Sequence, residues 1–411
     1  MTGMPAFNSI IAAAVDAEKF RCMPALQPFS PLAFDFIDAF SRNLRDQPAV
    51  RALPEMAALG FWMRRPNLMR LCSDFRSSSN GLLFQPRGTA FHIAPSNVDS
   101  MFVYSWFLST ICGNKNIVRL PSRSSPALTL LTGVLEQLLG CEEWRPIAER
   151  AMLVRYDRED ERPTAYFSGI CDLRVIWGGD ATVSAIRRVP LGPRACEVAF
   201  ANKFSAAIVR ADGWNLALAS QQQEWLRRFF NDAYSFGQMA CSSPRLVIWH
   251  GSTAAVALAQ QSFWEGLAAL ARMRDTQLTP IDYVNKRTAA DLIALQFPVT
   301  IRESGPNAIC RIGMPVESLR QLIDTELHCG AGLFYETSVD TLDALEPVLD
   351  RRIQTLAYAG YGDGAELRDY VSGRTLAGID RIVPFGSALN FAPVWDGFDL
   401  FRTFMRQVTV N

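Results

Sequence analysis

The sequence predicts an α/β protein of two to three domains in which parallel strands alternate with crossover helices. Its length of 411 residues corresponds to that number at about 150 residues per domain. Short apolar runs rich in β-branched residues alternate with longer stretches at helical spacing from Gly88 onward, which is the pattern of parallel strands joined by helices. Apolar residues make up 49% and charged residues 20% of the chain, so enough apolar material is present for a sizeable core.

The first half of the chain divides into a helical stretch and an alternating stretch. Apolar residues lie at helical spacing within residues 1–80, for example Phe34, Ile37 and Phe40, and a polar run at 77–80 marks a boundary. After that boundary we expect strands at 91–94, 116–120, 151–154 and 173–177, and helices at 99–111 and 129–139.

The second half repeats the alternation and ends in an aromatic tail. We expect strands at 206–209, 246–249 and 380–384, and helices at 225–236, 253–273 and 314–328. In the tail, Phe398, Phe401 and Phe404 can form either a core or an oligomer interface. The predicted boundaries give four parts, 1–80, 81–205, 206–375 and 376–411.

The charge and cysteine content exclude several classes of protein. Lys and Arg together number 41, as do Asp and Glu, which argues against nucleic-acid binding because that function needs a net basic surface. Nine cysteines without a Cys-x-x-Cys pair, and only three histidines, predict no metal site. Residues 1–30 hold no sustained apolar signal segment, and the most apolar stretch, 101–112, is too short to span a membrane. We therefore expect a cytoplasmic protein, in a reducing compartment, with no membrane span.

The stretch Gly237-Gln238-Met239-Ala240-Cys241-Ser242-Ser243-Pro244-Arg245 is the most informative part of the chain. It lies between a predicted helix and a predicted strand, which places Cys241 in a turn among small residues. A cysteine in such a turn is accessible, and backbone N–H groups of the turn can stabilise its nucleophilic thiolate. A buried structural cysteine beside a Ser-Ser-Pro turn would give the same local sequence. If Cys241 is a nucleophile, the protein forms thioesters.

A second motif joins the strand at 91–94 to the following helix through Pro95-Ser96-Asn97. Asn97 can direct its side-chain amide toward a neighbouring site. Alternatively, Ser96 or Asn97 caps the helix that begins near Asp99. His92, on the strand, is interpreted as a core residue rather than a catalyst.

A third motif, Trp177-Gly178-Gly179-Asp180, ends one strand and leads into a helix. Glycines at this point let the backbone approach a phosphate at the positive N-terminus of the helix. Turns that follow strands also contain glycine for other reasons, so the motif is a weak signal by itself. The loop at 360–364 is interpreted as a flexible turn.

These three motifs, in their order along the chain, resemble the aldehyde dehydrogenase superfamily. Within it they resemble the acyl-CoA reductase branch, which includes the fatty-acid (long-chain acyl-CoA) reductase of bacterial bioluminescence. The resemblance covers about residues 80–400 and is carried by residues 93–97, 113–122, 177–180, 200–205, the Cys241 turn and 378–386.

The resemblance implies a fold and a set of site residues. A Rossmann-like cofactor domain would occupy 81–205 with residues 1–80 packed on it, an α/β catalytic domain would occupy 206–375, and 376–411 would return to the cofactor domain or to an oligomer interface. Cys241 would be the nucleophile, and Asn97 would supply one oxyanion donor beside the backbone N–H of Cys241. The residues expected to bind the cofactor are Pro95, Ser96, Arg119, Ser122, Arg123, Gly178, Gly179 and Asp180.

Two departures from the superfamily pattern bear on the expected chemistry. The element Glu-Leu-Gly-Gly-Lys, whose Glu activates the hydrolytic water, corresponds here to residues 199–203, and Ala199 replaces the Glu. This loss favours reduction of an acyl thioester over oxidation of an aldehyde, because a reductase must keep water away from its thioester. Arg123 stands about where NAD-preferring relatives carry a Glu, and an arginine pairs with a 2′-phosphate, so NADPH is expected rather than NADH.

The expected function is NADPH-dependent reduction of an acyl thioester to the aldehyde through an S-acyl intermediate on Cys241. The favoured substrate is a fatty acyl-CoA. An NAD(P)+-dependent aldehyde dehydrogenase and a non-catalytic scaffold in an acyl-transfer complex stay open as alternatives. The resemblance also implies a homo-oligomer, an activated acyl donor and an acyl-activating or acyl-transfer partner enzyme. The length of the acyl chain cannot be read, because generic apolar side chains line such tunnels.

Overall fold

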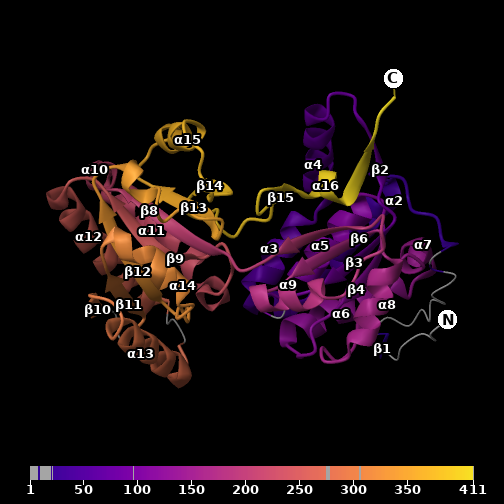
Figure 1. Ribbon diagram of the computed structural model, residues 1–411, viewed down its shortest axis with the longest axis horizontal. Helices are drawn as coiled ribbons and strands as arrows, with labels where there is room; N and C mark the ends of the chain where they lie inside the picture. The colour runs from indigo at the N-terminus through magenta and orange to yellow at the C-terminus, as the bar shows by residue number, and fades with distance from the viewer. Residues whose placement is uncertain are drawn as a thin grey trace. The chain divides into compact units, whose positions relative to one another are not determined.

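The computed structural model describes residues 8–9, 20, 22–95, 97–274, 278–304 and 307–410, and it divides into two compact units (Figure 1). The first unit takes the residues up to Asn202 together with those from Phe391 onward, and the second takes Lys203–Asn390. The α/β fold predicted from the sequence is confirmed, because each unit is a largely parallel sheet with helices. The four-part division is finer than these two units and stays a prediction.

The first unit is built on a sheet with the strand order β1-β5-β4-β3-β6-β7. Its strands are β1 (Asn8–Ser9), β3 (Thr89–Ile93), β4 (Lys115–Arg119), β5 (Ala151–Arg155), β6 (Leu173–Trp177) and β7 (Cys196–Phe200). All neighbours are parallel except β1, which pairs antiparallel with β5 at the edge. β3 lies between β4 and β6, so the order of strands reverses direction on its two sides. Every residue of β3 and β6 is buried, as expected for parallel strands covered on both faces.

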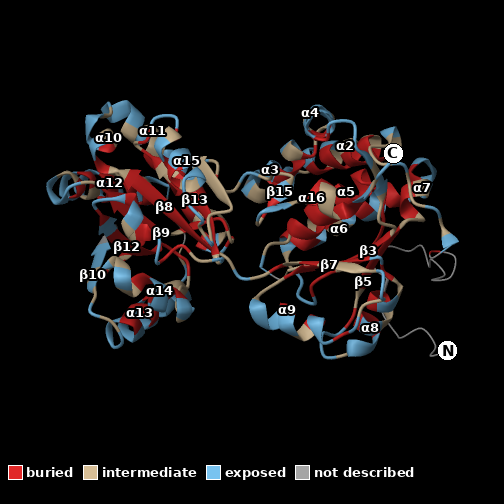
Figure 2. Ribbon diagram, turned by 45° about the horizontal axis from the view of Figure 1, so that its top comes forward, coloured by how far each residue is buried: buried red, intermediate tan, exposed pale blue. Residues whose placement is uncertain are grey.

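Helices cover both faces of this sheet, and the buried positions follow the strands (Figure 2). They are α2 (Pro31–Arg45), α3 (Pro54–Trp62), α4 (Arg65–Ser78), α5 (Met101–Ile111), α6 (Pro126–Leu139), α7 (Arg145–Ala148), α8 (Glu161–Ile170), α9 (Asp180–Arg187) and α16 (Leu400–Phe404), with 3-10 turns η1 (Pro48–Ala52) and η2 (Glu142–Trp144). Helix α2 begins after Ser30, whose hydroxyl accepts a hydrogen bond from the N–H of Ala33. Its apolar stripe, including Phe34, Ile37 and Phe40, is buried as the helical spacing predicted.

The C-terminal segment belongs to the first unit. β17 (Met405–Val408) pairs antiparallel with β2 (Leu83–Pro86), and β15 (Val394–Trp395) pairs with β16 (Phe398–Asp399). Phe401 and Phe404 are fully buried there, and the ring of Phe401 lies 5.4 Å from that of Phe75. These two residues of the aromatic tail are therefore core residues, whereas Phe398 is exposed.

The second unit is built on a sheet with the strand order β10-β11-β12-β9-β8-β13-β14. Its strands are β8 (Phe204–Arg210), β9 (Pro244–His250), β10 (Thr300–Ser304), β11 (Ile309–Gly313), β12 (Leu333–Val339), β13 (Ile353–Ala359) and β14 (Arg381–Pro384). Neighbours are parallel except β10, which is antiparallel to β11. The first strand of the unit, β8, lies between β9 and β13, so this sheet also reverses its order beside its first strand.

Alternate side chains of these strands enter two separate cores. Ala207 and Val209 of β8 pack in a core with α10 (Ala211–Leu216), α11 (Ala219–Tyr234) and α12 (Thr253–Met273). Ala206 and Ile208 pack on the other face with α13 (Pro280–Ala294), α14 (Leu319–Asp324) and α15 (Ala365–Ser372). The period of two along the strand thus explains why β8 reads as an unbroken apolar run: both of its faces are covered.

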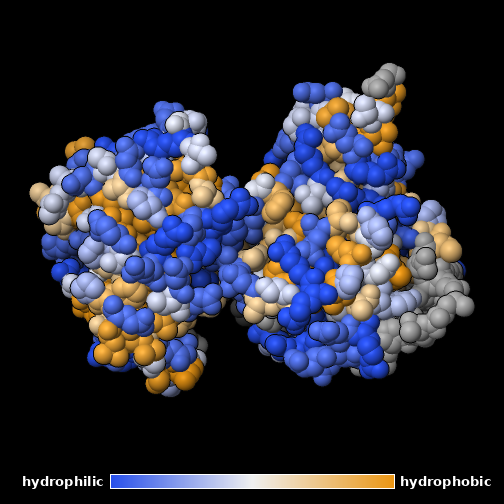
Figure 3. Space-filling model, viewed as in Figure 1, coloured by the Kyte–Doolittle hydropathy of each residue, from blue (hydrophilic) through white to orange (hydrophobic). Residues whose placement is uncertain are grey.

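Two details of the second unit differ from a simple amphipathic pattern. The helix expected at 314–328 is shorter, because the 3-10 turn η4 (Val316–Ser318) precedes α14 and the chain turns at Glu326, which has a positive φ of 53°. Helix α13 packs inward through Ala290 and Ile293, yet apolar side chains also gather on its outer face (Figure 3), namely Ile281, Val284, Leu292 and Leu295.

Among the described residues, no helix is both long and apolar enough to cross a membrane.

Candidate functional site

Cys241 lies in the connection between α11 and β9, as the sequence predicted. The 3-10 turn η3 (Ser235–Gln238) follows α11, and three consecutive residues there, Phe236, Gly237 and Gln238, have φ values of 55°, 59° and 65°. A non-glycine residue in this left-handed region costs about 1–3 kcal/mol and persists only where its surroundings hold it. The chain therefore reaches Cys241 through a constrained turn, which places the cysteine three residues before the start of β9.

Gln238 holds this turn in place, a role that the sequence analysis did not predict. It is fully buried, and its side-chain amide donates hydrogen bonds to the carbonyls of Pro244 at 3.0 Å and Leu333 at 2.9 Å. Its amide oxygen accepts a bond from the N–H of Gly332 at 2.9 Å. One side chain thus ties the cysteine turn to the beginnings of both β9 and β12. The only sequence signal was a polar amide within an otherwise apolar and small stretch.

A second loop closes on the same turn. The N–H of Ala331 donates to the carbonyl of Gly237 at 2.9 Å. Gly330 has a positive φ of 74°, and a Cβ at this position would lie 2.3 Å from the oxygen of Gly237. Only glycine lets the two backbones approach this closely. The loop before β12 therefore helps to fix the backbone that leads to Cys241.

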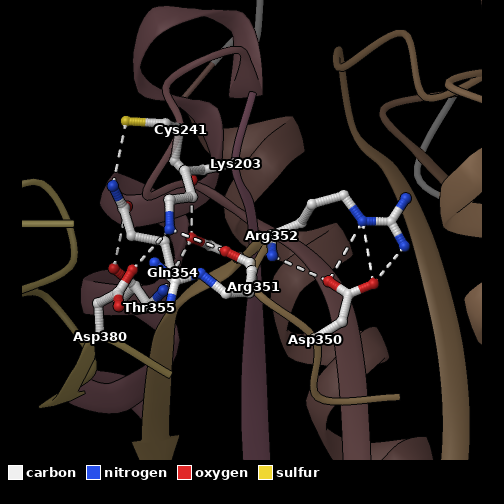
Figure 4. Close-up of polar contacts among 9 residues, drawn as sticks. Lys203, Cys241, Asp350, Arg351, Arg352, Gln354, Thr355 and Asp380 are labelled. Carbon is white, nitrogen blue, oxygen red and sulfur yellow. Dashed lines mark hydrogen bonds and ion pairs between the residues drawn. The ribbon is translucent and has the colours of Figure 1, made fainter. Parts of the chain in front are cut away.

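Cys241 is partly exposed, and its sulfur contacts the start of β13 (Figure 4). Nε2 of Gln354 donates to its Sγ at 3.6 Å. The carbonyl of Cys241 accepts a bond at 2.7 Å from the hydroxyl of Ser205 on β8, and that hydroxyl accepts from the N–H of Thr355 at 3.2 Å. Residues more than a hundred positions apart thereby surround the cysteine, and the alternative of a fully buried structural cysteine does not hold.

An ion pair lies beside this cluster. Nζ of Lys203 contacts the carboxylate of Asp380 at 2.8 Å and donates to the carbonyl of Arg351 at 2.8 Å (Figure 4). Both residues belong to segments on which the family resemblance rests. The pair joins the start of β8 to the start of β14, so Lys203 has a structural partner within the second unit.

The far side of the turn contains groups that burial keeps neutral. Burial lowers the pKa of His328 to about 3, and the positive charge of Arg245 adds to that shift. Its Nε2 donates to the carbonyl of Leu333 at 2.8 Å and its Nδ1 accepts from the N–H of Gly330 at 3.2 Å. Burial also raises the pKa of Tyr335 well above its ordinary value. His328 is therefore a neutral, structural residue near neutral pH, and it carries no extra proton to give to a substrate.

In the first unit, the predicted residues after β3 lie at the carboxyl end of the strand. Pro95 is partly buried, Asn97 is exposed, and Ser96 lies outside the described residues. Helix α5 begins at Met101 with Ser100 as its N-cap residue and no side-chain capping bond. The capping alternative is therefore wrong for Asn97, because the helix starts four residues beyond it. Its side chain faces solvent within this unit.

The predicted residues after β4 are at the carboxyl end of the neighbouring strand. Arg119, the last residue of β4, has its guanidinium 4.6 Å from the ring centroid of Tyr156. Ser122 and Arg123 are exposed. Arg123 contacts the carboxylate of Asp99 at 3.5 Å, and Ser125 donates to the same carboxylate at 2.5 Å. Arg123 thus has an acidic neighbour, but the long contact leaves half of its side chain accessible.

The Gly-Gly turn lies at the carboxyl end of β6. Gly179 is the N-cap residue of α9 and supplies no side-chain cap, so the first N–H groups of the helix face outward from the turn. A Cβ on Gly178 would lie 3.0 Å from Thr182, and one on Gly179 would lie 3.0 Å from the side chain of Asn202. Asp180 accepts a bond from the N–H of Asn202 at 3.0 Å. Close packing within the unit therefore also accounts for both glycines.

The structure brings the predicted cofactor residues to adjacent strand ends. β4, β3 and β6 are neighbours, and β3 is the strand at which the order of the sheet reverses. In doubly wound α/β sheets, dinucleotides bind at the carboxyl ends of the strands at this switch point. A reduced nicotinamide dinucleotide fits these residues, since an uncapped helix N-terminus and an accessible arginine lie at the same edge. Cys241 belongs to the other unit, and its pairing with Asn97 stays a prediction.

His92 behaves as the sequence indicated. It is buried, its Nδ1 lies 2.8 Å from the hydroxyl of Ser105, and its Nε2 lies 3.0 Å from Oδ1 of Asn116. Burial lowers its pKa to about 4. Its interpretation as a satisfied core residue is confirmed.

Comparison with known proteins connects this geometry to a family. A family model described as acyl-CoA reductase (LuxC) matches residues 65–296, more than half of the chain. No curated protein matches the chain significantly.

Several solved structures share the fold. Methylmalonate-semialdehyde dehydrogenase from Oceanimonas doudoroffii superimposes with a TM-score of 0.66 at 14% identity, covering 98% of this chain and 88% of that chain. An oxidoreductase from Marinobacter aquaeolei gives a TM-score of 0.65 at 10% identity, with 94% and 87% covered. Glyceraldehyde-3-phosphate dehydrogenase from Methanocaldococcus jannaschii, complexed with NADP, gives 0.63 at 10% identity, with 96% and 91% covered.

At these identities the solved structures show the fold alone, and the fold is that of the aldehyde dehydrogenases. The predicted fold and the predicted relationship are both confirmed. The family match adds the class of chemistry, which is that of an oxidoreductase acting on acyl or aldehyde groups. The chain belongs to the acyl-CoA reductase (LuxC) family.

Proposed function

We propose that this protein reduces an acyl thioester, fatty acyl-CoA above all, to the aldehyde with NADPH through an S-acyl intermediate on Cys241. The observation that carries the proposal is a partly exposed cysteine in a turn fixed by Gln238, in a chain of the acyl-CoA reductase family. A nucleophile benefits from such preorganisation because the reacting atom then needs little rearrangement.

The first half-reaction is acyl transfer to the sulfur. The thiol proton of Cys241 leaves to solvent, and the thiolate attacks the carbonyl carbon of the thioester. In our proposal the side-chain amide of Asn97 and the backbone N–H of Cys241 donate to the oxyanion that forms. Collapse of this intermediate breaks the bond to the CoA sulfur, releases CoA as its thiolate and leaves the acyl group on Cys241.

The second half-reaction converts the S-acyl group to aldehyde. When bound, NADPH would supply the hydride for this reduction. Collapse of the resulting thiohemiacetal releases the aldehyde and regenerates the cysteine thiolate. Ala199 matters here, because hydrolysis of the S-acyl group would need a base to activate water and an alanine cannot supply one.

Intact-protein mass spectrometry tests the proposal directly. We expect incubation with a long-chain acyl-CoA to add the mass of one acyl group, and addition of NADPH to remove it with release of aldehyde. Cys241→Ala should abolish both the adduct and turnover, whereas Cys329→Ala, another partly exposed cysteine of the second unit, should retain both. Acid formed from aldehyde with NAD(P)+ would identify a dehydrogenase instead, and no adduct with any acyl donor would identify a scaffold.

The preference for NADPH is part of the proposal and has its own support. In our proposal the nicotinamide dinucleotide is lined by Pro95, Ser96 and Arg119. Its ribose phosphate is faced by Ser122 and Arg123. Its pyrophosphate lies at Gly178, Gly179 and Asp180. Half of the Arg123 side chain is accessible for a 2′-phosphate. Arg123→Ala should therefore raise KM for NADPH about tenfold, in proportion to the loss of one charge-assisted contact, and leave KM for NADH unchanged. Equal KM values for NADPH in the variant and the wild type would remove this assignment.

The acyl donor and the assembly also belong to the proposal. We expect an activated acyl donor, either acyl-CoA or the product of an acyl-activating or acyl-transfer partner enzyme, and a homo-oligomer. Light scattering coupled to size-exclusion chromatography measures the oligomeric state, and competition between acyl-CoA chain lengths measures the preferred acyl group.

A further inference from the structure

Arg245 is an arginine beside the cysteine turn that has no carboxylate partner among the residues that the structure describes. It is the second residue of β9 and lies four positions after Cys241 in the chain. Its Nη2 makes one long hydrogen bond, 3.4 Å, to the carbonyl of Met239, and its Nε is buried without a hydrogen-bond partner. The guanidinium carbon lies 5.8 Å from the ring centroid of Phe204. Among the described residues, no acidic side chain forms an ion pair with Arg245.

The other titratable groups around the turn leave this positive charge unbalanced. His328 and Tyr335 are neutral because burial shifts the pKa of each away from its charged form, and burial likewise raises the pKa of Cys329. Lys203 is paired with Asp380. Arg352, at the start of β13, is paired with Asp350 and Asp324. Within the described part of the second unit, Arg245 is therefore a cation beside the cysteine turn that no ion pair balances, and unlike the exposed Arg351 it is partly buried.

Gln354 presents a donor to the sulfur in a fixed orientation. The hydroxyl of Thr355 donates to Oε1 of Gln354 at 3.2 Å, so the oxygen end of the amide is engaged and the NH2 end faces Cys241. The backbone carbonyl of Gln354 accepts from the N–H of Asp380 at 2.9 Å, which fixes the residue at the start of β13. An N–H donor directed at a sulfur favours the thiolate over the thiol, because only the anion is a strong acceptor.

We infer that Arg245 and Gln354 together stabilise Cys241 as its thiolate, Gln354 by an N–H bond to the sulfur and Arg245 as the unpaired positive charge. The inference rests on the proposed role of Cys241 as the nucleophile. It lets the cysteine react without proton transfer to His328, which burial keeps neutral: the proton passes to solvent and the remaining anion is compensated electrostatically. Gln354 contacts the reacting atom, and Arg245 is a positioning residue that acts through its charge.

The electrostatics of Arg245 agree with this arrangement. Burial lowers the pKa of Arg245, and the negative charge of Cys241 opposes that change. The interaction between two charges is mutual. The attraction to Cys241 that keeps the guanidinium of Arg245 protonated therefore also favours the thiolate of Cys241. A counter-ion role also accounts for an arginine whose Nε is buried without a partner, an arrangement that is costly unless a compensating charge is near.

Peptide-resolved alkylation of the full chain with iodoacetamide, measured against pH without acyl-CoA or NADPH, tests the inference. In the wild type, the midpoint for Cys241 should lie below that of free cysteine in the same buffer. Arg245→Met should raise the midpoint by at least half a pH unit and slow alkylation at pH 7 at least threefold. Arg245→Lys should recover most of the wild-type rate because it keeps the charge, and Gln354→Leu should give a smaller shift in the same direction as Arg245→Met. Cys22 and Cys141, exposed cysteines of the first unit, are the internal references and should be unchanged in every variant.

Thermal melting of each variant establishes that it is folded. The alkylation midpoint of Cys241 in the wild type tests the inference even if a variant fails to fold. A wild-type midpoint at or above that of free cysteine overturns the inference. So does an unchanged midpoint in both Arg245→Met and Gln354→Leu, or an Arg245→Lys variant that behaves like Arg245→Met. These outcomes are separate from the proposed function, which fails instead if Cys241→Ala retains turnover, whatever the alkylation profiles.

Discussion

The two units have the same arrangement of strands around a central strand, yet their polar clusters lie at opposite ends of it. In the first unit β3 lies between β4 and β6, and the predicted cofactor residues follow the carboxyl ends of these strands. In the second unit β8 lies between β9 and β13 in the same way. Its cysteine cluster, however, lies at the amino ends, because Cys241 precedes β9 and Gln354 is the second residue of β13.

The carboxyl end of the second sheet holds a closed network instead. Nδ1 of His250, at the end of β9, lies 2.7 Å from the hydroxyl of Tyr361 and 3.4 Å from Arg210. Arg210 in turn pairs with Glu366. Each group has a partner, and the pKa of His250 is lowered by burial and then by Arg210. The switch-point rule would thus account for the proposed nucleotide site but not for the proposed nucleophile, which lies in a turn before a strand.

The largest effect should come from the first unit, at the sheet edge where we propose that the cofactor binds. If Asn97 donates to the oxyanion, Asn97→Ala should lower kcat by about 10²–10³-fold, the usual cost of losing one such donor. Steady-state reduction of acyl-CoA measures this, and melting should be unchanged because the side chain is exposed. Asn97→Asp, which keeps the shape but lacks the amide donor, should be equally slow. Turnover within threefold of wild type in both variants would confine the chemistry to the second unit.

The next effect concerns the turn before β9. Gln238→Leu would remove three buried hydrogen bonds to backbone groups, at about 1 kcal/mol or more each, so we expect a loss of about 3 kcal/mol in the free energy of unfolding. Urea unfolding followed by tryptophan fluorescence measures it. Gln296→Leu removes a single exposed hydrogen bond and should cost less than about 0.5 kcal/mol. Equal stabilities of the two variants would mean that the turn does not depend on Gln238.

One histidine in each unit should make the stability of the protein depend on pH. The folded pKa is about 4 for His92 and about 3 for His328, both below the ordinary 6.5. The unfolded chain therefore binds protons first, and stability is full above pH 6.5 and is lost as the pH falls toward the folded value. Between pH 7 and pH 5 each histidine should contribute a loss of about 2 kcal/mol.

Glutamine variants isolate these two contributions. In His92→Gln and in His328→Gln, the difference in unfolding free energy between pH 7 and pH 5 should shrink by about 2 kcal/mol relative to wild type. Chemical unfolding at the two pH values provides the measurement. A pH dependence identical to that of the wild type would show that the histidine in question is not kept neutral in the folded state.

The smallest effect should come from the carboxyl edge of the second unit. Tyr361→Phe removes the hydroxyl that contacts His250 and should lower the free energy of unfolding by about 1 kcal/mol. Turnover should stay at the wild-type value, since this edge has no part in the proposed reaction. A tenfold loss of turnover in a folded variant would instead give this edge a function and remove the contrast between the two units.

The sequence by itself was sufficient for the local elements and for the class of chemistry. The apolar runs at 206–209 and 246–249 became β8 and β9 because both faces of these strands are covered, which makes the whole run apolar. The helix at 314–328 was overestimated, since apolar spacing cannot register a turn set by Glu326. The three motifs together were enough for the family, because their combination and order along the chain are more specific than any one motif, which local packing could also explain.

Only the tertiary structure decided which groups surround the sulfur. Gln354 and Ser205 reach Cys241 from strands distant in the chain, and the order β9-β8-β13 makes them neighbours. Periodicity reports whether a residue is buried but not which strand lies beside it, because sheet order depends on how long-range pairs satisfy backbone hydrogen bonds. For the same reason, only the tertiary structure showed that no described carboxylate pairs with Arg245.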